Sequence, residues 1–255
     1  MSNIYFWLNS PSIHQAPFIR ELNKQWDGDI FVIVENDIDL KRKQTGWSLP
    51  SFGDLELIIK PERKERDALI KRIPEKSFHV FSGFNAYRET YRTLKKVSKF
   101  KGVFICVHVE PGRQDEGVKS LLRKFRHRLL AFQWRNKIDC VLGTGSQGVK
   151  WWKKAGFYNH QVVEWGYSVD FPDNTKKQMF SVTKTSFTIV IVASLTKGKN
   201  HRVLIKALSH LSGWTLSVIG DGSEKKRLKE LVTNLGLVDK VDFKGNILNQ
   251  EVFRH

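Results

Sequence analysis

The feature that most constrains the fold is a pattern repeated between residues 187 and 245: an apolar run, a loop of small or polar residues, and a helical segment. The first unit reads FTIVIVASL, TKGKN and HRVLIKALSHL, and the second reads TLSVIGDG and SEKKRLKELVTNLGL, followed by the run VDFKG. The runs 188–195 and 216–219 do not alternate in polarity and are rich in β-branched residues, which is typical of parallel strands covered on both faces. The pattern predicts an α/β fold with a parallel sheet.

Polar and small residues follow both of these runs, at the sheet edge where parallel α/β sheets bind their ligands. Glycine lets an anionic group approach the backbone closely, and the free amides at a helix start favour phosphate. A lysine in the first loop adds a mobile positive charge. The sequence therefore predicts a diphosphate site, and its candidate residues are Ser194, Lys199, Asn200, Gly220, Asp221 and Gly222.

The run ASLTKGKNHRVLIKAL, followed by LSVIGDGSEKKRLKELVTNLGLVDKVDFKG, resembles the start of the donor-binding domain of family 4 glycosyltransferases, the glycosyl transferases group 1. The resemblance implies the GT-B architecture, in which two Rossmann-like domains hold a nucleotide-diphosphate sugar as co-substrate, without a metal cofactor. It implies that the six candidates bind the donor. An ordinary doubly wound domain for another nucleotide is the alternative, since the same physics permits it.

The residues before this domain predict a second α/β unit. Further strands are expected at 4–8, 30–34, 55–59, 79–81, 103–107, 140–142 and 161–164, and helices from about Pro17 and over 86–97, 117–137 and 147–155. In the family, the strand, helix, glycine and Val-Asp order that ends here at Asp170 closes the N-terminal domain. We therefore expect an N-terminal acceptor-side domain over 1–170, a linker over 171–186 and an incomplete nucleotide-sugar-binding domain over 187–255.

Four residues at predicted strand ends are candidates for the sugar-handling site of the first domain. His14 and Gln15 lie in the loop after the first strand, where the family usually has glycines, and are candidate acceptor contacts. His108 matches the family histidine that reaches the donor sugar and is the candidate catalytic residue. Glu110 is a further candidate acceptor contact. A lone histidine is more often structural than functional, and His14 can equally be an ordinary loop residue.

The segment 117–137 is strongly basic, with seven Lys or Arg and no acid. Its apolar residues recur at helical spacing, which predicts an amphipathic helix whose apolar stripe packs on the sheet while the basic side chains extend over anionic lipid head groups. The candidate membrane contacts are Arg123, Lys124, Arg126 and Arg128. Solvated charges or nucleic-acid phosphates would explain the same pattern, although no recognised nucleic-acid module is visible.

The charge and cysteine content of the chain limit its possible partners and its cellular compartment. The chain has a formal net charge of +17, and the first 186 residues carry +12 of it, which indicates an anionic partner for the N-terminal domain. Cys106 and Cys140 are too few for a disulfide framework, and no spacing suggests a metal. The low cysteine content suits a reducing cytosol, and because no apolar run is long enough to span a bilayer, any membrane contact must be peripheral. We therefore expect a cytoplasmic protein, peripheral at the inner face of the cytoplasmic membrane.

Two departures from the family pattern affect the expected activity. Ser194 stands where many members have an arginine that pairs with the diphosphate. The sequence ends at His255, whereas members continue for roughly a hundred residues more, including the paired glutamates that hold the donor. We expect a retaining hexosyltransferase of surface polysaccharide biosynthesis (capsule, O-antigen or lipopolysaccharide), with activity of the 255-residue form left open. The alternative is a truncated, non-catalytic relative that docks on anionic membrane or polysaccharide machinery.

Overall fold

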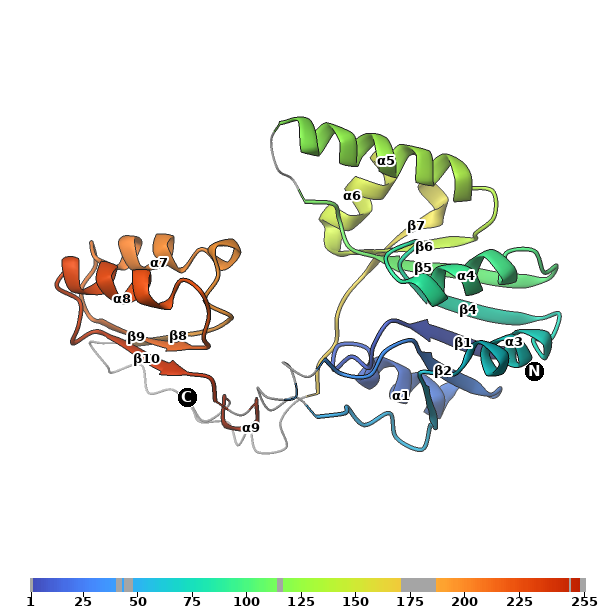
Figure 1. The fold of residues 1–255 in the computed structure, drawn as a ribbon, viewed down its shortest axis with the longest axis horizontal. Coiled ribbons are helices and arrows are strands. Elements are labelled where there is room, and N and C mark those ends of the chain that lie inside the picture. Colours follow the sequence, from blue (N-terminus) through green and yellow to red (C-terminus); the bar gives the residue numbers. More distant parts are fainter. Residues whose placement is uncertain are drawn as a thin grey trace. The chain divides into compact units, whose positions relative to one another are not determined.

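The computed structural model describes residues 2–39, 43, 48–113, 117–170, 187–247 and 249–252. The chain forms two compact units, one containing residues 2–38 and 49–170 and the other containing the strands from Phe187 onward. Figure 1 shows the elements of both units. The predicted linker, residues 171–186, lies outside the described residues, so the domain boundaries stay a prediction.

The first unit is built on a seven-stranded, wholly parallel sheet with the order β3-β2-β1-β4-β5-β6-β7. Its strands are β1 (Asn3–Leu8), β2 (Ile30–Val34), β3 (Leu57–Ile59), β4 (Ser77–Ser82), β5 (Val103–Val109), β6 (Cys140–Thr144) and β7 (Val162–Trp165). Its helices are α1 (Ala16–Gln25), α3 (Arg63–Lys71), α4 (Arg88–Val97), α5 (Val118–Trp134) and α6 (Gly145–Ala155). The predicted α/β class is confirmed, while α3 was not predicted.

The two faces of this sheet carry separate cores, because side chains alternate along each strand. Tyr5 and Trp7 of β1 pack with residues of α3, α4, α5 and α6, whereas Ile4 and Phe6 pack with α1 on the other face. All five residues from Ile4 to Leu8 are buried. This two-sided burial explains why β1 reads as a continuous apolar run.

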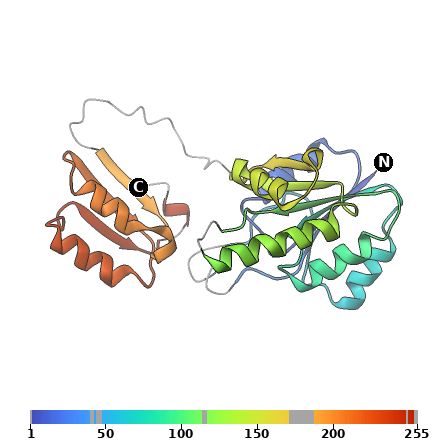
Figure 2. The ribbon, with the colours of Figure 1, turned by 90° about the horizontal axis from the view of Figure 1, so that it is seen from above.

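The second unit contains a three-stranded parallel sheet with the order β10-β9-β8. Its strands are β8 (Phe187–Val192), β9 (Trp214–Ile219) and β10 (Val241–Gly245), and its helices are α7 (His201–Leu208), α8 (Lys225–Asn234) and the short α9 (Asn249–Val252). Figure 2 shows α7 and α8 together on one face of the sheet. The expectation that β8 is covered on both faces is wrong, because Val190 and Val192 on its other face are exposed.

Helix α5 has the predicted position but not the predicted orientation. Its apolar stripe does not pack on the sheet, because every member is 54–73% exposed: Val118, Leu121, Leu122, Phe125, Leu129 and Phe132. A second stripe, formed by Ser120, Leu130, Ala131 and Trp134, is buried instead. Burying the larger Trp134 against Phe84 and Tyr91 fixes the rotation of the helix and turns the Leu and Phe side chains outward. No helix within the described ranges is both long and apolar enough to cross a bilayer.

Candidate functional site

Three polar side chains meet at the carboxyl edge of the first sheet. His108 lies near the end of β5, Thr144 ends β6, and Gln15 precedes α1 in the loop after β1. The Nε2 atom of His108 is 3.0 Å from Thr144 Oγ1, and its Nδ1 atom is 3.4 Å from Gln15 Nε2. Thr144 Oγ1 also lies 3.3 Å from the Val109 carbonyl, to which it donates.

These contacts assign the tautomer of His108. Because the Thr144 hydroxyl proton goes to a carbonyl, its oxygen accepts from His108 Nε2–H, and the unprotonated Nδ1 accepts from the Gln15 amide. Burial lowers the pKa of His108, and the nearby Glu110 opposes this only in part. The ring is therefore neutral and held in one orientation. The sequence placed His108 just after its strand, whereas it is still part of β5.

Tyr167 links the other two predicted residues of this edge. Its hydroxyl donates to Glu110 Oε1 at 2.7 Å, and its ring centroid lies 5.2 Å from that of His14 and 5.6 Å from that of His108. Burial and the Glu110 carboxylate raise the pKa of Tyr167 to about 12, so it stays a hydrogen-bond donor at neutral pH. Three of the four sequence candidates, His14, His108 and Glu110, thus lie around one tyrosine that sequence reasoning did not single out, and Gln15 joins them through His108.

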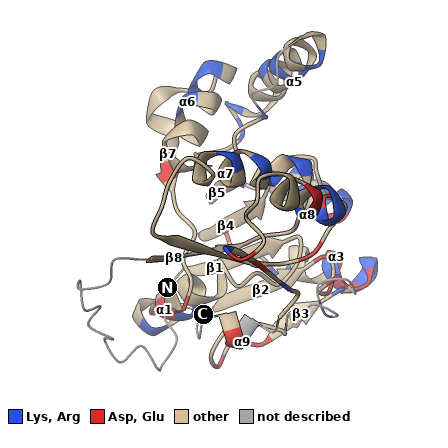
Figure 3. Cartoon of the chain, turned by 90° about the vertical axis from the view of Figure 1, so that its left-hand side faces the viewer, with Lys and Arg blue, Asp and Glu red and all other residues tan. Residues whose placement is uncertain are grey.

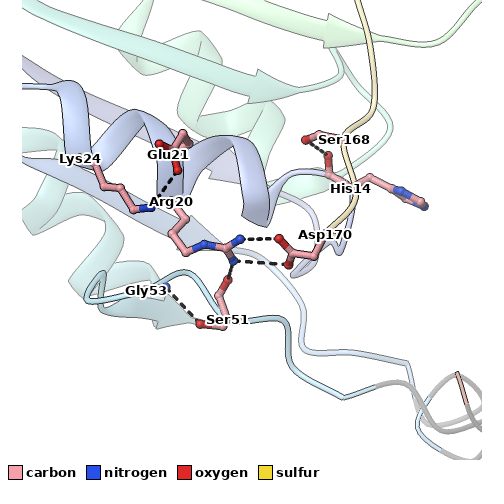
Figure 4. A network of polar contacts seen from close by, with 8 residues as sticks. All are labelled: His14, Arg20, Glu21, Lys24, Ser51, Gly53, Ser168 and Asp170. Carbon is pink, nitrogen blue, oxygen red and sulfur yellow. Dashed lines mark hydrogen bonds and ion pairs between the residues drawn. The ribbon is translucent and has the colours of Figure 1, made fainter. Parts of the chain in front are cut away.

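A polar network connects the loop of His14 and helix α1 to the segment after β7, which carries Tyr167 and Asp170. Arg20 of α1 pairs with the Asp170 carboxylate and donates to the Ser51 carbonyl at 3.0 Å, as Figure 4 shows. The Ser168 amide donates to the His14 carbonyl at 3.2 Å. The imidazole of His14 points away from Asp170 in this view. The loop carrying His14 is therefore fixed against the segment carrying Tyr167.

Three buried polar atoms at this edge have no hydrogen-bond partner within the described part of the chain. They are Gln15 Oε1, His14 Nδ1 and Ser82 Oγ. A buried polar group left unpaired costs about 1–3 kcal/mol, so these enclosed atoms lower the stability of this edge. Sequence reasoning did not select Ser82, Thr144 or Tyr167 as candidates for this edge. Their positions could have identified them, since each lies at or just beyond the end of a predicted strand.

The second unit brings the two predicted phosphate loops to one edge of its sheet. Val192 at the end of β8 is in register with Ile219 at the end of β9. Beyond the strands, the Leu195 amide donates to the Asp221 carbonyl at 2.9 Å, and the Glu224 amide donates to the Leu195 carbonyl at 2.9 Å. Ser194 therefore lies in a loop that is hydrogen-bonded to the loop of Gly220, Asp221 and Gly222.

Packing explains why glycine occupies positions 220 and 222, and the sequence interpretation missed this explanation. A Cβ on Gly220 would lie 2.1 Å from the Ala193 carbonyl oxygen, and one on Gly222 would lie 2.4 Å from that of Leu195. The Asp221 carboxylate accepts from Lys225 at 2.5 Å and from the Gly222 amide at 2.7 Å, which lowers its pKa. The glycine-rich turn is thus shaped by contact with the neighbouring loop.

Lys199 and Asn200 form the entrance to α7. Lys199 ends a short 3-10 turn, Lys197–Lys199, and is exposed. Asn200 has φ +53°, a left-handed conformation that asparagine tolerates better than most residues. Asn200 lines a pocket of about 600 Å³ between α7 and α8, which neither Lys199 nor Gly220 lines. Buried His201 also lines it, and burial followed by the charge of Lys199 lowers the His201 pKa.

The basic residues predicted on α5 lie beside its exposed apolar stripe. Lys124, Arg126 and Arg128 are exposed, and Arg123 is half-buried with its guanidinium donating to the Arg113 carbonyl at 2.6 Å. Figure 3 shows Lys and Arg at intervals along this helix and on α7 and α8. Basic and apolar side chains therefore share the outer surface of α5.

Comparisons with known proteins identify the second unit. Residues 173–254 match the family model of the glycosyl transferases group 1. No curated protein of similar sequence was found. No described group of three or more His, Cys, Asp or Glu residues is arranged to hold a metal ion.

Solved structures share the fold at low sequence identity. The Anabaena Alr3699/HepE protein in complex with UDP is 16% identical with a TM-score of 0.62, and the match covers 96% of this chain and 69% of that one. The lipopolysaccharide outer core galactosyltransferase WaaB is 14% identical with a TM-score of 0.56, covering 99% of this chain and 70% of that one. A UDP-N-acetylglucosamine 2-epimerase is 11% identical with a TM-score of 0.52, covering 98% and 70%.

Because a galactosyltransferase and an epimerase share this fold, the fold alone does not define the reaction. The family match over residues 173–254 does separate them, and it confirms the resemblance found in the sequence. The C-terminal part of the chain is a glycosyl transferases group 1 domain, and the chain has a GT-B fold over the part of that architecture that it spans.

Proposed function

We propose that this protein is a retaining glycosyltransferase that moves a hexose from a nucleotide-diphosphate sugar to a carbohydrate or lipid-linked acceptor in surface polysaccharide biosynthesis. The observation that carries this proposal is the group 1 family match over residues 173–254. UDP is the nucleotide we favour, because the Anabaena protein of the same fold was solved with UDP and with UDP-glucose.

The donor diphosphate is held electrostatically in this proposal. Lys199 is exposed on the loop that precedes α7, and the Gly220–Gly222 turn precedes α8 at the same sheet edge. A mobile ammonium and the positive end of a helix stabilise the charge that develops on a leaving diphosphate, with no metal needed. Ser194 supplies a hydroxyl where many family members have an arginine, so Lys199 carries more of the phosphate binding. The departing phosphate oxygen takes the acceptor's proton.

The acceptor binds at the carboxyl edge of the first sheet. His14 and Gln15 lie at this edge beside Tyr167 and His108, and their polar side chains suit the hydroxyl groups of a sugar. Neutral His108, fixed by Thr144 and Gln15, orients the donor sugar and does not act as a base. Glu110 is already engaged by Tyr167 and contacts the acceptor through its second oxygen.

Helix α5 docks the protein on the inner face of the cytoplasmic membrane in this proposal. Its outer surface combines six exposed Leu, Val and Phe side chains with exposed Lys124, Arg126 and Arg128. Apolar residues enter the interface between head groups and acyl chains, and the neighbouring cations bind anionic head groups. This arrangement replaces the predicted one, in which the apolar stripe faced the sheet and only the charges reached the lipid.

The alternative function is a non-catalytic relative that keeps the membrane-docking surface. It is favoured by Ser194 in the diphosphate loop, where many family members have an arginine. Calorimetry with UDP- and GDP-sugars decides between the two, because absence of any diphosphate-dependent heat with the full chain would remove the enzyme proposal. Lys199→Ala should weaken nucleotide binding about tenfold, whereas the matched Lys197→Ala should leave it nearly unchanged.

A further inference from the structure

A basic pocket of about 460 Å³ lies among α3, α4 and the C-terminal part of α5. Nine ionisable side chains line it, seven cationic and two acidic. Both acids are already engaged, because Asp67 pairs with Lys96 and Glu89 pairs with Arg92. Five cations have no carboxylate partner among the described residues: Arg63, Arg66, Lys95, Lys99 and Lys137.

Arg66 is the buried member of this group, with only 4% of its surface exposed. Its guanidinium lies over the Trp7 ring, 6.0 Å from the centroid. Within the ranges that the structure describes, no acceptor lies at hydrogen-bond distance from the guanidinium and no carboxylate at ion-pair distance. Burial lowers the pKa of Arg66 while Glu35 and Glu89 act in the opposite direction. The guanidinium of Arg66 lines the pocket, and its nitrogens are not among the fully enclosed unpartnered atoms, so its N–H donors are available to an anion that enters.

The position of the pocket separates it from the sugar-transfer site. Lys99 and Lys137 follow the ends of α4 and α5, and each precedes the start of the next strand, β5 or β6. They therefore mark the amino edge of the sheet, whereas His108 and Thr144 lie at the carboxyl edge. The pocket also shares no lining residue with the site of His108, Thr144, Gln15 and Tyr167, so it is a separate site.

We propose that this pocket binds a phosphate group, with the Arg66 guanidinium as the central ligand and Arg63, Lys99 and Lys137 around it. The planar fork of arginine matches two phosphate oxygens, while the lysines act as point charges. The phosphate belongs either to a free phosphate compound or to a lipid head group, and the two sources present the same chemistry to these side chains. This inference stands whether or not the chain transfers sugar.

The test compares two double variants that remove equal charge from the first unit. Arg63→Gln/Lys99→Gln changes the pocket, and Lys150→Gln/Lys153→Gln changes exposed lysines on α6. Thermal stabilisation by inorganic phosphate and by glycerol phosphate is measured at constant ionic strength, and flotation is measured with phosphatidylglycerol and phosphatidylcholine vesicles. We expect the pocket variant to weaken the phosphate response at least about threefold, and the α6 variant to match the wild type.

Each outcome has one meaning. A loss confined to the soluble phosphates assigns a free ligand, and a loss confined to phosphatidylglycerol vesicles assigns a head group. Equal responses of both double variants in every arm would overturn the proposal, because the charges would then act only through general screening. Arg66→Lys keeps the charge but removes the fork; wild-type phosphate binding by this variant would contradict the role given to Arg66.

Discussion

His108 Nε2 lies 3.0 Å from the hydroxyl oxygen of Thr144 on the neighbouring strand, and that hydroxyl is itself 3.3 Å from a carbonyl that fixes its direction. His108 lies one residue before the end of β5, Thr144 ends the adjacent parallel strand β6, and both are in the same hydrogen-bond chain with Gln15. The ring of His108 is thereby positioned by a residue with no direct part in the chemistry. Its neutral state follows from burial.

Thr144→Val is expected to lower kcat/KM for sugar transfer about fivefold, because it removes one neutral hydrogen bond of about 1 kcal/mol that orients His108. Thr144→Ser keeps the hydroxyl and should keep most of the activity. The pKa of His108, followed by NMR, provides a second readout that moves only if the imidazole environment changes. If Thr144→Val and Thr144→Ser behave alike in both measurements, Thr144 does not position His108.

Gly222→Ala is expected to destabilise the second unit, because its Cβ would lie 2.4 Å from the Leu195 carbonyl oxygen. Overpacking against backbone costs about 1–3 kcal/mol, since neither loop can move without breaking its hydrogen bonds. Gly198→Ala is the matched control, because nothing lies within 4 Å of its added Cβ. Denaturant unfolding of the full chain measures both variants. An equal loss in Gly198→Ala would show that the loop contact is not the cause.

His79 makes the stability of the first unit depend on pH. It is fully buried, accepts from Trp7 Nε1 at 3.1 Å, and has a pKa lowered by burial from 6.5 to about 4. Because the folded-state pKa is below the unfolded one, its contribution is present above pH 6.5 and is lost as pH falls toward 4.

The expected loss from this group between pH 7 and pH 5 is about 2 kcal/mol, measured by urea unfolding at both values. His79→Asn, which keeps an acceptor for Trp7, should flatten this part of the profile. The carboxyl groups with lowered pKa, such as Asp67, change protonation mostly at lower pH. His108, His127 and His201 have the same sign as His79 and remain in the variant. An unchanged slope in His79→Asn would therefore assign the pH dependence to them.

The sequence predicted the parts of the fold that depend on local pattern. Strand β2 has its predicted bounds, and the helix ending at Gly156 stops there because glycine adopts φ +110° at its C-cap. The carboxyl-edge position of His108 followed from chain order alone. Local pattern does not show which strands become neighbours. Cys106 and Cys140, for example, are distant in the sequence and are register partners on β5 and β6.

The rotation of a helix about its own axis, which decides the face that is buried, could not be predicted from the sequence either. Two stripes run along α5, and helical periodicity alone is compatible with burial of either one in the core. Trp134 decides between them, since it is 2% exposed and packs on Phe84. Similarly, the glycines at 220 and 222 indicated an open phosphate loop, but only coordinates show that the Ala193 and Leu195 carbonyls occupy the space beside them. Contacts between segments distant in sequence determine both features.

The outward stripe of α5 predicts membrane binding with an apolar as well as an electrostatic part. Phe125→Ser/Leu129→Ser removes two side chains that are 61% and 54% exposed, so folding should be unaffected. Full burial of one such side chain stabilises membrane binding by about 1.5–3 kcal/mol. Even if both side chains insert only in part, the wild type should bind vesicles at least about tenfold more tightly than this double variant. Arg126→Gln/Arg128→Gln should instead weaken binding mainly at low salt. Flotation on phosphatidylglycerol vesicles at two salt concentrations separates these effects. If vesicle binding disappears entirely at high salt and does not change in Phe125→Ser/Leu129→Ser, only charge holds the helix at the membrane surface. If the protein binds random DNA equally well, the anionic partner is nucleic acid and not the membrane.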